Sequence, residues 1–163
     1  MAVLRFLLAL LLLGTLAACG FQLRGTAEIP QDLSPIYVQA ADSSPVRAAM
    51  LRRLELNPGA LTGNAADARL LIRILGESRS ARVAAVDRGG KVIAQELHLR
   101  VRFDAASPDG SERVPPQTLD LVRTFENPDV EVLGKQQEAD LIYQDLAEDA
   151  ADRILLRLRA VLL

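Results

Sequence analysis

The side chains most often used for catalysis or metal binding are scarce in this sequence, which has one cysteine, Cys19, and one histidine, His98. Zinc and iron–sulfur centres need three or four such ligands, so these two residues cannot build one. The sequence also lacks the nucleophile elbow of hydrolases, the phosphate-binding P-loop and the zinc-protease motif. Neighbouring carboxylates such as Glu148 and Asp149 diverge by about 100° on a helix and form no acid–base pair. We therefore expect no enzyme and no cofactor.

The first eighteen residues, MAVLRFLLALLLLGTLAA, have the layout of a secretory signal peptide. Arg5 supplies the positive charge, a continuous apolar run extends from Phe6 to Leu13, and small residues come last. The run is too short for a membrane-spanning helix, and a buried helix of a globular domain would have a polar face, which this segment lacks. We expect residues 1–18 to be a signal peptide that is removed during export.

The four residues from Leu16 to Cys19 resemble a bacterial lipobox, the motif at which a cysteine is acylated and becomes the first residue after cleavage. A thiolate is the side-chain nucleophile best suited to accept a diacylglyceryl group. Several acyl chains, such as palmitate, then give stable membrane attachment. The next residue is Gly20 rather than the aspartate that marks inner-membrane retention. The resemblance therefore implies export through the inner membrane and a lipid anchor on Cys19 in the outer membrane.

The composition limits the class of protein further. The chain of 163 residues is 50% apolar, carries a net charge of −2 and has an isoelectric point near 5.5. These values exclude a disordered chain, a disulfide-rich scaffold and a polytopic membrane protein. Binding to nucleic acid calls for a basic surplus, so we expect no nucleic-acid partner. Residues 19–163 should form a single domain, of which residues 19–35 are an extended N-terminal tether.

Charge is distributed unevenly along the chain. Residues 69–102 contain eight basic and three acidic side chains, whereas residues 126–152 contain nine acidic and one basic. One interpretation is that both segments present solvated faces. The other is that the arginine-rich segment meets an anionic or hydrogen-bond-accepting partner, and the sequence leaves both interpretations open.

Two periodic patterns predict secondary structure. From Glu96 to Asp104 apolar and polar residues alternate, which predicts a strand with one core face and one polar face. His98 lies on the polar face among arginines, where we expect a solvated or partner-packed side chain. Apolar residues at helical spacing follow Ser44 and Pro45, the expected N-cap and first helical residue, until Asn57-Pro58-Gly59 ends the helix.

The other patterns complete a two-layer domain. The expected elements are a strand at 36–39, a hairpin over 70–104 with its tip near Arg88 and Gly89, a bulge near Gly76, a strand at 117–125 and a helix at 136–160. The element order is then β-α-β-β-β-α. We predict an α+β fold in which two helices pack on one face of a four-stranded, mostly antiparallel or mixed sheet.

Residues 19–25 read CGFQLRG, and the chain also contains RTFENP at 123–128 and GKQ at 134–136. In this order and spacing after a lipobox, these motifs resemble the LptE family of lipopolysaccharide-assembly lipoproteins. The resemblance covers most of the chain. It implies a small lipoprotein that sits as a plug inside the large outer-membrane β-barrel LptD, helps that barrel assemble, and contacts lipopolysaccharide on its way to the cell surface.

The resemblance further implies basic residues that contact the phosphates of lipopolysaccharide. Two positions match, Arg88 at the hairpin tip and Lys135 before the last helix, and each could form charge-assisted hydrogen bonds. The alternative for Arg88 is an exposed turn residue, and for Lys135 a solvent-facing residue at the helix entry. For the whole protein, the alternatives are a solute-binding or transport-auxiliary lipoprotein with another partner, and a cell-wall enzyme.

The lipid anchor gives a first prediction. Replacing Cys19 by alanine removes the only acceptor thiol, so Cys19→Ala should accumulate as an unprocessed precursor that retains residues 1–18. Gel mobility and membrane fractionation of the expressed protein measure this. A normally sized, membrane-attached product from the variant would contradict the lipobox assignment.

Overall fold

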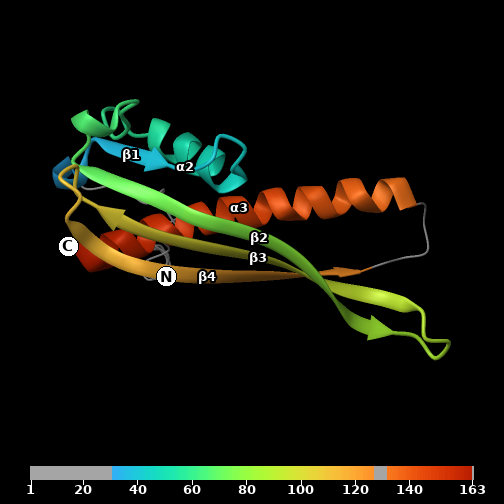
Figure 1. Cartoon of the computed structure of the whole chain (residues 1–163). Helices are drawn as coiled ribbons and strands as arrows, with labels where there is room; N and C mark the ends of the chain where they lie inside the picture. The colour runs from blue at the N-terminus through green and yellow to red at the C-terminus, as the bar shows by residue number, and fades with distance from the viewer. Residues whose placement is uncertain (1–30, 127–131, 163) are drawn as a thin grey trace, which may run out of the picture.

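The computed structural model describes residues 31–126 and 132–162, and its sheet and helices follow the predicted order (Figure 1). The elements are η1 (Gln31–Leu33), β1 (Ile36–Gln39), α2 (Pro45–Glu55), η2 (Ala65–Asp67), β2 (Leu70–Val86), β3 (Val92–Ala106), β4 (Glu112–Glu126) and α3 (Val132–Leu162). The predicted signal peptide, Cys19 and most of the predicted tether lie outside the described residues. The described end of the tether forms the short turn η1, whose Leu33 is buried in the core.

The sheet has the order β1-β2-β3-β4, in which β1 runs parallel to β2 and the other pairs are antiparallel. α2 is the crossover that a parallel pair requires. On β3, alternate residues such as Leu99, Val101 and Phe103 are fully buried in one core with residues of both helices, whereas Arg100 and Arg102 are exposed. Both helices therefore pack on one face, and the predicted α+β fold is confirmed.

Local sequence signals place α2. The Ser44 hydroxyl oxygen accepts a hydrogen bond from the Arg47 backbone N–H at 2.8 Å, and Pro45 occupies the first turn, where no amide donor is needed. The buried residues of the helix recur at helical spacing: Val46, Ala49, Met50 and Leu54. The helix thus begins where the cap was predicted.

β4 and α3 are longer than predicted. β4 begins at Glu112 rather than 117, so it includes Pro115 and Pro116. Its pairing with β3 shifts register between Gln117 and Val114, so the two prolines fall where the regular ladder is interrupted, on a strand with an open outer edge. The two prolines predicted a loop before residue 117. The sequence alone does not show that this strand lies at the edge of the sheet, where proline is tolerated.

The predicted bulge in β2 is confirmed. The register with β3 shifts between Ile74 and Gly76, which leaves Leu75 without a paired residue. Before the shift, Ile74 lies opposite Phe103 on the helix-facing side. After it, Glu77 and Arg79 lie on that side, opposite core residues of β3. One extra residue therefore turns polar side chains toward the helices.

The opposite face of the sheet holds one buried ion pair. Asp104 is 4% exposed and accepts two hydrogen bonds from the Arg73 guanidinium, at 2.6 and 2.7 Å. The two residues are cross-strand partners, so the pleat places them side by side. The hydrogen bond with Asp104 raises the pKa of Arg73 above its usual value. The paired arginine satisfies a carboxylate that would otherwise be buried alone.

This ion pair gives a stability prediction. Asp104→Ala removes the acceptors of Arg73, and we expect it to lower the free energy of unfolding by about 1–3 kcal/mol. Urea denaturation followed by circular dichroism measures the change. Asp120→Ala is the matched control, because Asp120 pairs with Arg100 at 2.9 Å at an exposed site, where such a pair contributes roughly 0–1 kcal/mol. Equal losses in both variants would contradict the prediction.

Candidate functional site

The turn between β2 and β3 fixes the position of Arg88. The Asp87 carboxylate accepts hydrogen bonds from the backbone N–H groups of Gly89 and Lys91, at 2.8 and 2.9 Å. Gly90 has a φ of 82°, which favours glycine. These contacts close the hairpin tip and leave Arg88 exposed in it. Figure 1 shows this hairpin reaching beyond the part of the sheet that the helices cover.

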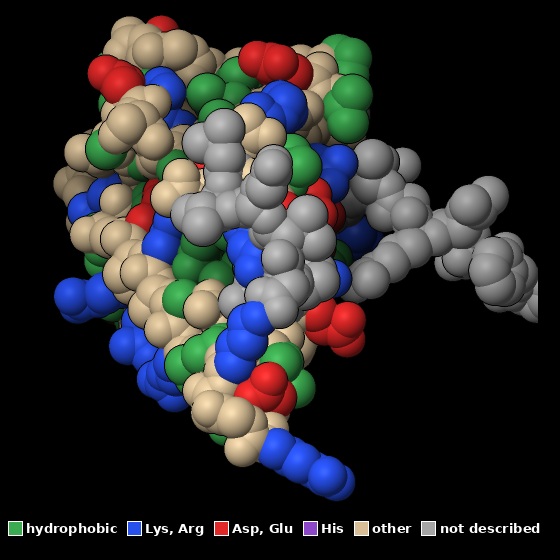
Figure 2. All heavy atoms as spheres, turned by 90° about the vertical axis from the view of Figure 1, so that its right-hand side faces the viewer, with side chains coloured by type: hydrophobic (Ala, Val, Ile, Leu, Met, Phe, Trp, Pro, Cys, Tyr) green, Lys and Arg blue, Asp and Glu red, His purple; other side chains and the backbone are tan. Residues whose placement is uncertain are grey.

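Lys135 lies in the first turn of α3 and is half-buried. α3 begins at the end of the molecule toward which the β2–β3 hairpin extends, so the fold brings Arg88 and Lys135 to the same end (Figure 1). Figure 2, which looks onto that end, shows several Lys and Arg side chains projecting from it. Cys19, the third predicted site residue, lies outside the described residues.

The outer face of the sheet carries the charged residues that alternate with the core of β3. Arg100 donates a hydrogen bond to Asp120 at 2.9 Å, and this bond, helped by one with His98, lowers the pKa of Asp120. The His98 ring nitrogens lie 3.5 Å from carboxylate oxygens of Asp120 and Glu96. His98 thus lies largely buried between two carboxylates, with Ser80 of β2 as its cross-strand partner.

Three further arginines of the hairpin and the outer face differ from Arg100. Arg82, Arg88 and Arg102 are exposed, and none of them makes a hydrogen bond or ion pair within the described part of the chain. Arg82 and Arg102 lie on the outer face through their pairing with Glu96 and Thr118. This face therefore offers guanidinium groups that are available to an acceptor from outside the domain.

The acidic run on α3 is largely used inside the domain. Ion pairs connect it to α2 and to the sheet: Arg52–Glu148 at 3.1 Å, Arg53–Asp152 at 2.7 Å, Arg123–Asp149 at 3.1 Å and Arg79–Asp140 at 3.9 Å. The sequence alone suggested a solvated face or a contact face, and it did not show these pairs. Because the partners come from distant segments, only the fold brings them together.

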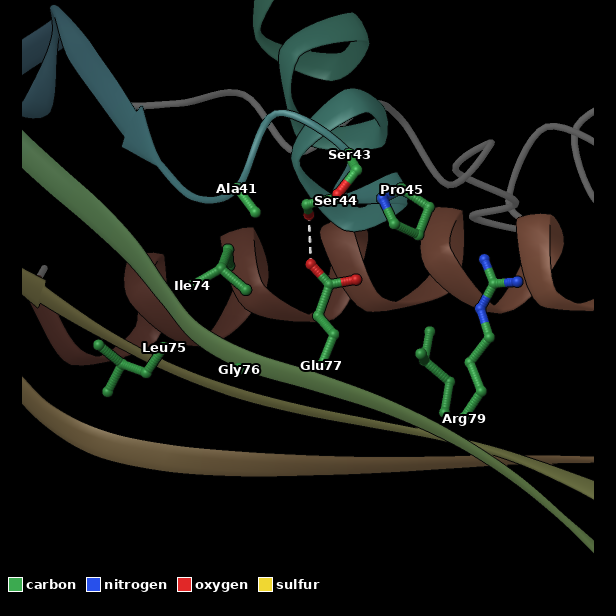
Figure 3. A pocket seen from close by; sticks show the side chains of 10 residues that line it. Ala41, Ser43, Ser44, Pro45, Ile74, Leu75, Gly76, Glu77 and Arg79 are labelled. Carbon is green, nitrogen blue, oxygen red and sulfur yellow. Dashed lines mark hydrogen bonds between the residues drawn. The ribbon is translucent and has the colours of Figure 1, made fainter.

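A cavity of about 490 Å³ lies between the N-terminus of α2 and the bulged part of β2. Its lining includes apolar Ile74, Leu75 and Leu99 together with polar Glu77 and Arg79. Figure 3 shows Ser44 directed toward Glu77, with a hydrogen bond from the Ser44 hydroxyl to the carboxylate. Ser44, Glu77 and Arg79 were not predicted to share a site. The signal available in the sequence was Gly76 inside a strand pattern, which indicates a bulge at this position.

Tyr143 of α3 fixes β2 next to this cavity. Its hydroxyl donates a hydrogen bond to the Ser80 carbonyl oxygen at 2.9 Å, and the Arg79 guanidinium carbon lies 4.9 Å from the centre of its ring. Burial raises the pKa of Tyr143. Within residues 31–126 and 132–162, no group of three or more His, Cys, Asp or Glu is arranged to hold a metal ion. The described helices include none long and apolar enough to cross a membrane.

Comparisons with known proteins agree with this fold. The LptE family model, described as lipopolysaccharide-assembly, matches residues 33–158. An LPS-assembly lipoprotein LptE from Photorhabdus laumondii is 30% identical over 160 residues, covering 98% of this chain and 86% of that protein. The protein of the same name from Yersinia pestis strain Pestoides F is 29% identical over 161 residues, covering 98% and 76%.

Two solved structures share the architecture. The solution structure of lipoprotein B from Nitrosomonas europaea has a TM-score of 0.67 and 25% identity, covering 83% of this chain and 88% of that one. The crystal structure of rare lipoprotein B from Shewanella oneidensis has a TM-score of 0.67 and 25% identity, covering 77% and 93%. Because the family match spans nearly all of the described domain, the chain belongs to the LptE family of lipopolysaccharide-assembly lipoproteins.

Proposed function

We propose that this protein is an outer-membrane lipoprotein, anchored through acylated Cys19, that works in lipopolysaccharide assembly. In this role it plugs and helps assemble an LptD-type β-barrel and contacts lipopolysaccharide during transport to the cell surface. The observation that carries the proposal is the LptE family match over residues 33–158, which includes β1 to β4 and nearly all of α3. The role is structural and non-enzymatic.

The outer face of the sheet supports the barrel contact. A domain seated inside a barrel lumen needs polar surfaces that hydrogen-bond to the barrel or to trapped water, as polar interfaces do. Arg82 and Arg102 extend from this face without partners in the described structure, and Arg100 is held by Asp120. The face therefore suits a wall rich in carboxylate and carbonyl acceptors.

The end of the molecule with the hairpin tip supports the lipopolysaccharide contact. Phosphate groups bind guanidinium and ammonium groups by charge-assisted hydrogen bonds. Arg88 is exposed in a tip whose backbone is fixed by Asp87, and Lys135 lies at the same end of the molecule. A tip of fixed conformation loses little entropy when it binds a phosphate.

Co-purification tests the barrel partnership. The tagged full-length lipoprotein, extracted from outer membranes in mild detergent, should retain an LptD-type barrel in about a one-to-one ratio, because plugs bury large polar interfaces. Mass spectrometry of the eluate identifies the bound protein. Elution without a large outer-membrane barrel would reject the plug and leave a solute-binding or transport-auxiliary lipoprotein with another partner as the better description.

The phosphate contact is tested by charge reversal. The double variant Arg88→Asp/Lys135→Asp should lose roughly tenfold or more in lipopolysaccharide binding while still retaining the barrel, because two charge-assisted contacts become repulsive. Binding of labelled lipopolysaccharide to the purified lipoprotein measures the effect. The matched control is Arg113→Asp/Arg159→Asp, which changes the same net charge at exposed positions of β4 and the C-terminal part of α3. Equal loss in both double variants would show a general charge effect and reject the site.

A further inference from the structure

β2 is much longer than the strand beside it. It runs for 17 residues, but β1 pairs only with Leu70 to Arg73. Beyond Arg73, the side of β2 that faces away from β3 has no paired strand in the described part of the chain. The free edge, as we call the outer side of β2 from Ile74 to Val86, therefore presents backbone N–H and C=O groups that can pair with another strand.

The two outer edges of the sheet are protected differently. On β4, Pro115 and Pro116 remove two amide donors and interrupt the ladder. The free edge of β2 contains no proline over thirteen residues and carries small side chains such as Ser78, Ser80 and Ala81. Natural sheets block open edges because such edges recruit other chains. Between the register shifts at Leu75 and after Val83, the described structure leaves this edge without a paired strand, so the edge is suited to pair with a partner.

The cavity beside α2 lies next to the free edge. After Gln39 the chain leaves the sheet to form α2, and no described strand continues the line of β1, although Ala41 and Ser44 border the cavity on that side. The cavity between the α2 N-terminus and β2 is lined there by Ile74, Leu75 and Leu99 (Figure 3). A strand added in line with β1 can therefore place an apolar side chain into this space, as alternate side chains do in strand addition.

Charge around the free edge indicates the chemistry of the added strand. Glu77 is already bonded to Ser44. The other charged residues of β2 along this edge are Arg79 and Arg82, on opposite faces of the sheet, and Arg88 follows at the tip. Arg79 has one long ion pair, at 3.9 Å, with Asp140, and Arg82 has none in the described structure. The surplus is basic, so an acidic segment complements it.

The free edge is held in position before any partner binds. The Tyr143 hydroxyl bonds to the Ser80 carbonyl and its ring lies under the Arg79 guanidinium, which ties the middle of β2 to α3. A backbone already fixed in extended conformation loses little entropy on pairing. We propose that the free edge is a docking site for an extended, acidic segment of the partner polypeptide, which adds to the sheet in line with β1. The inference rests on the proposed function, because that partner is the barrel.

Hydrogen exchange tests strand addition directly. The full lipidated protein is compared alone and in the co-purified barrel complex, with exchange measured for amides from Gly76 to Val86. Amides on the free edge should exchange quickly in the free protein and roughly tenfold or more slowly in the complex, because new ladder bonds protect them. Unchanged exchange in a complex that still contains the barrel overturns the inference and leaves the proposed function standing. Slow exchange already in the free protein also overturns it, since the edge would then be occupied by this chain or a second copy.

A pair of matched variants tests the role of charge. Arg82→Glu reverses a charge beside the free edge, and Arg113→Glu makes the same change at an exposed position of β4. In the complex, Arg82→Glu should lose most of the tenfold protection at the free edge, while Arg113→Glu should keep it, because close like charges oppose docking. Protection of the core amides of β3 shows that both variants fold. Loss in both variants, or in neither, overturns the acidic-segment assignment.

Discussion

The register shift at Leu75 is the constraint on which the arrangement of polar groups in this domain depends. Without the extra residue, the alternation that turns Ile72 and Ile74 toward the helices would continue, and Glu77 and Arg79 would face away from them. With it, the Glu77 carboxylate reaches the α2 N-cap, and Arg79 reaches Tyr143 and Asp140. One residue in one strand therefore couples the sheet to both helices through polar contacts, and it opens the cavity between them.

These contacts also decide which charges remain available at the surface. The carboxylates of α3 pair with arginines of α2, β2 and β4, so much of the negative charge of that helix is neutralised within the domain. Most such pairs are exposed and each contributes little to stability. Their larger effect is on recognition, because the guanidinium groups of Arg82, Arg88 and Arg102 make no ion pair within the described part of the chain. A chain of net charge −2 can thus present a basic end.

Features that depend on residues close together in the sequence could be predicted from the sequence. The alternation of β3, the Ser44 cap and the Asp87–Gly90 turn are local, and each appears in the structure where the pattern places it. The bulge was predicted from Gly76, but its consequence for Glu77 depends on pairing with β3, which the sequence does not show. The same holds for the Arg52–Glu148 contact, whose partners are 96 residues apart. Local chemistry thus placed Arg88, whereas tertiary pairing created the polar cavity.

The free edge and the hairpin tip belong to one continuous strand. The proposed strand docking along β2 and the proposed phosphate contact at Arg88 are therefore connected. Beyond the helices, the hairpin is held in the described structure by its own ladder and by the β3–β4 pairing, and a hairpin gains stability from a further strand or a packed face. A strand docked on the free edge gives β2 a second neighbouring strand there, opposite β3, and stiffens the approach to Arg88. Phosphate binding at the tip and strand docking along β2 then favour the same conformation, so each strengthens the other.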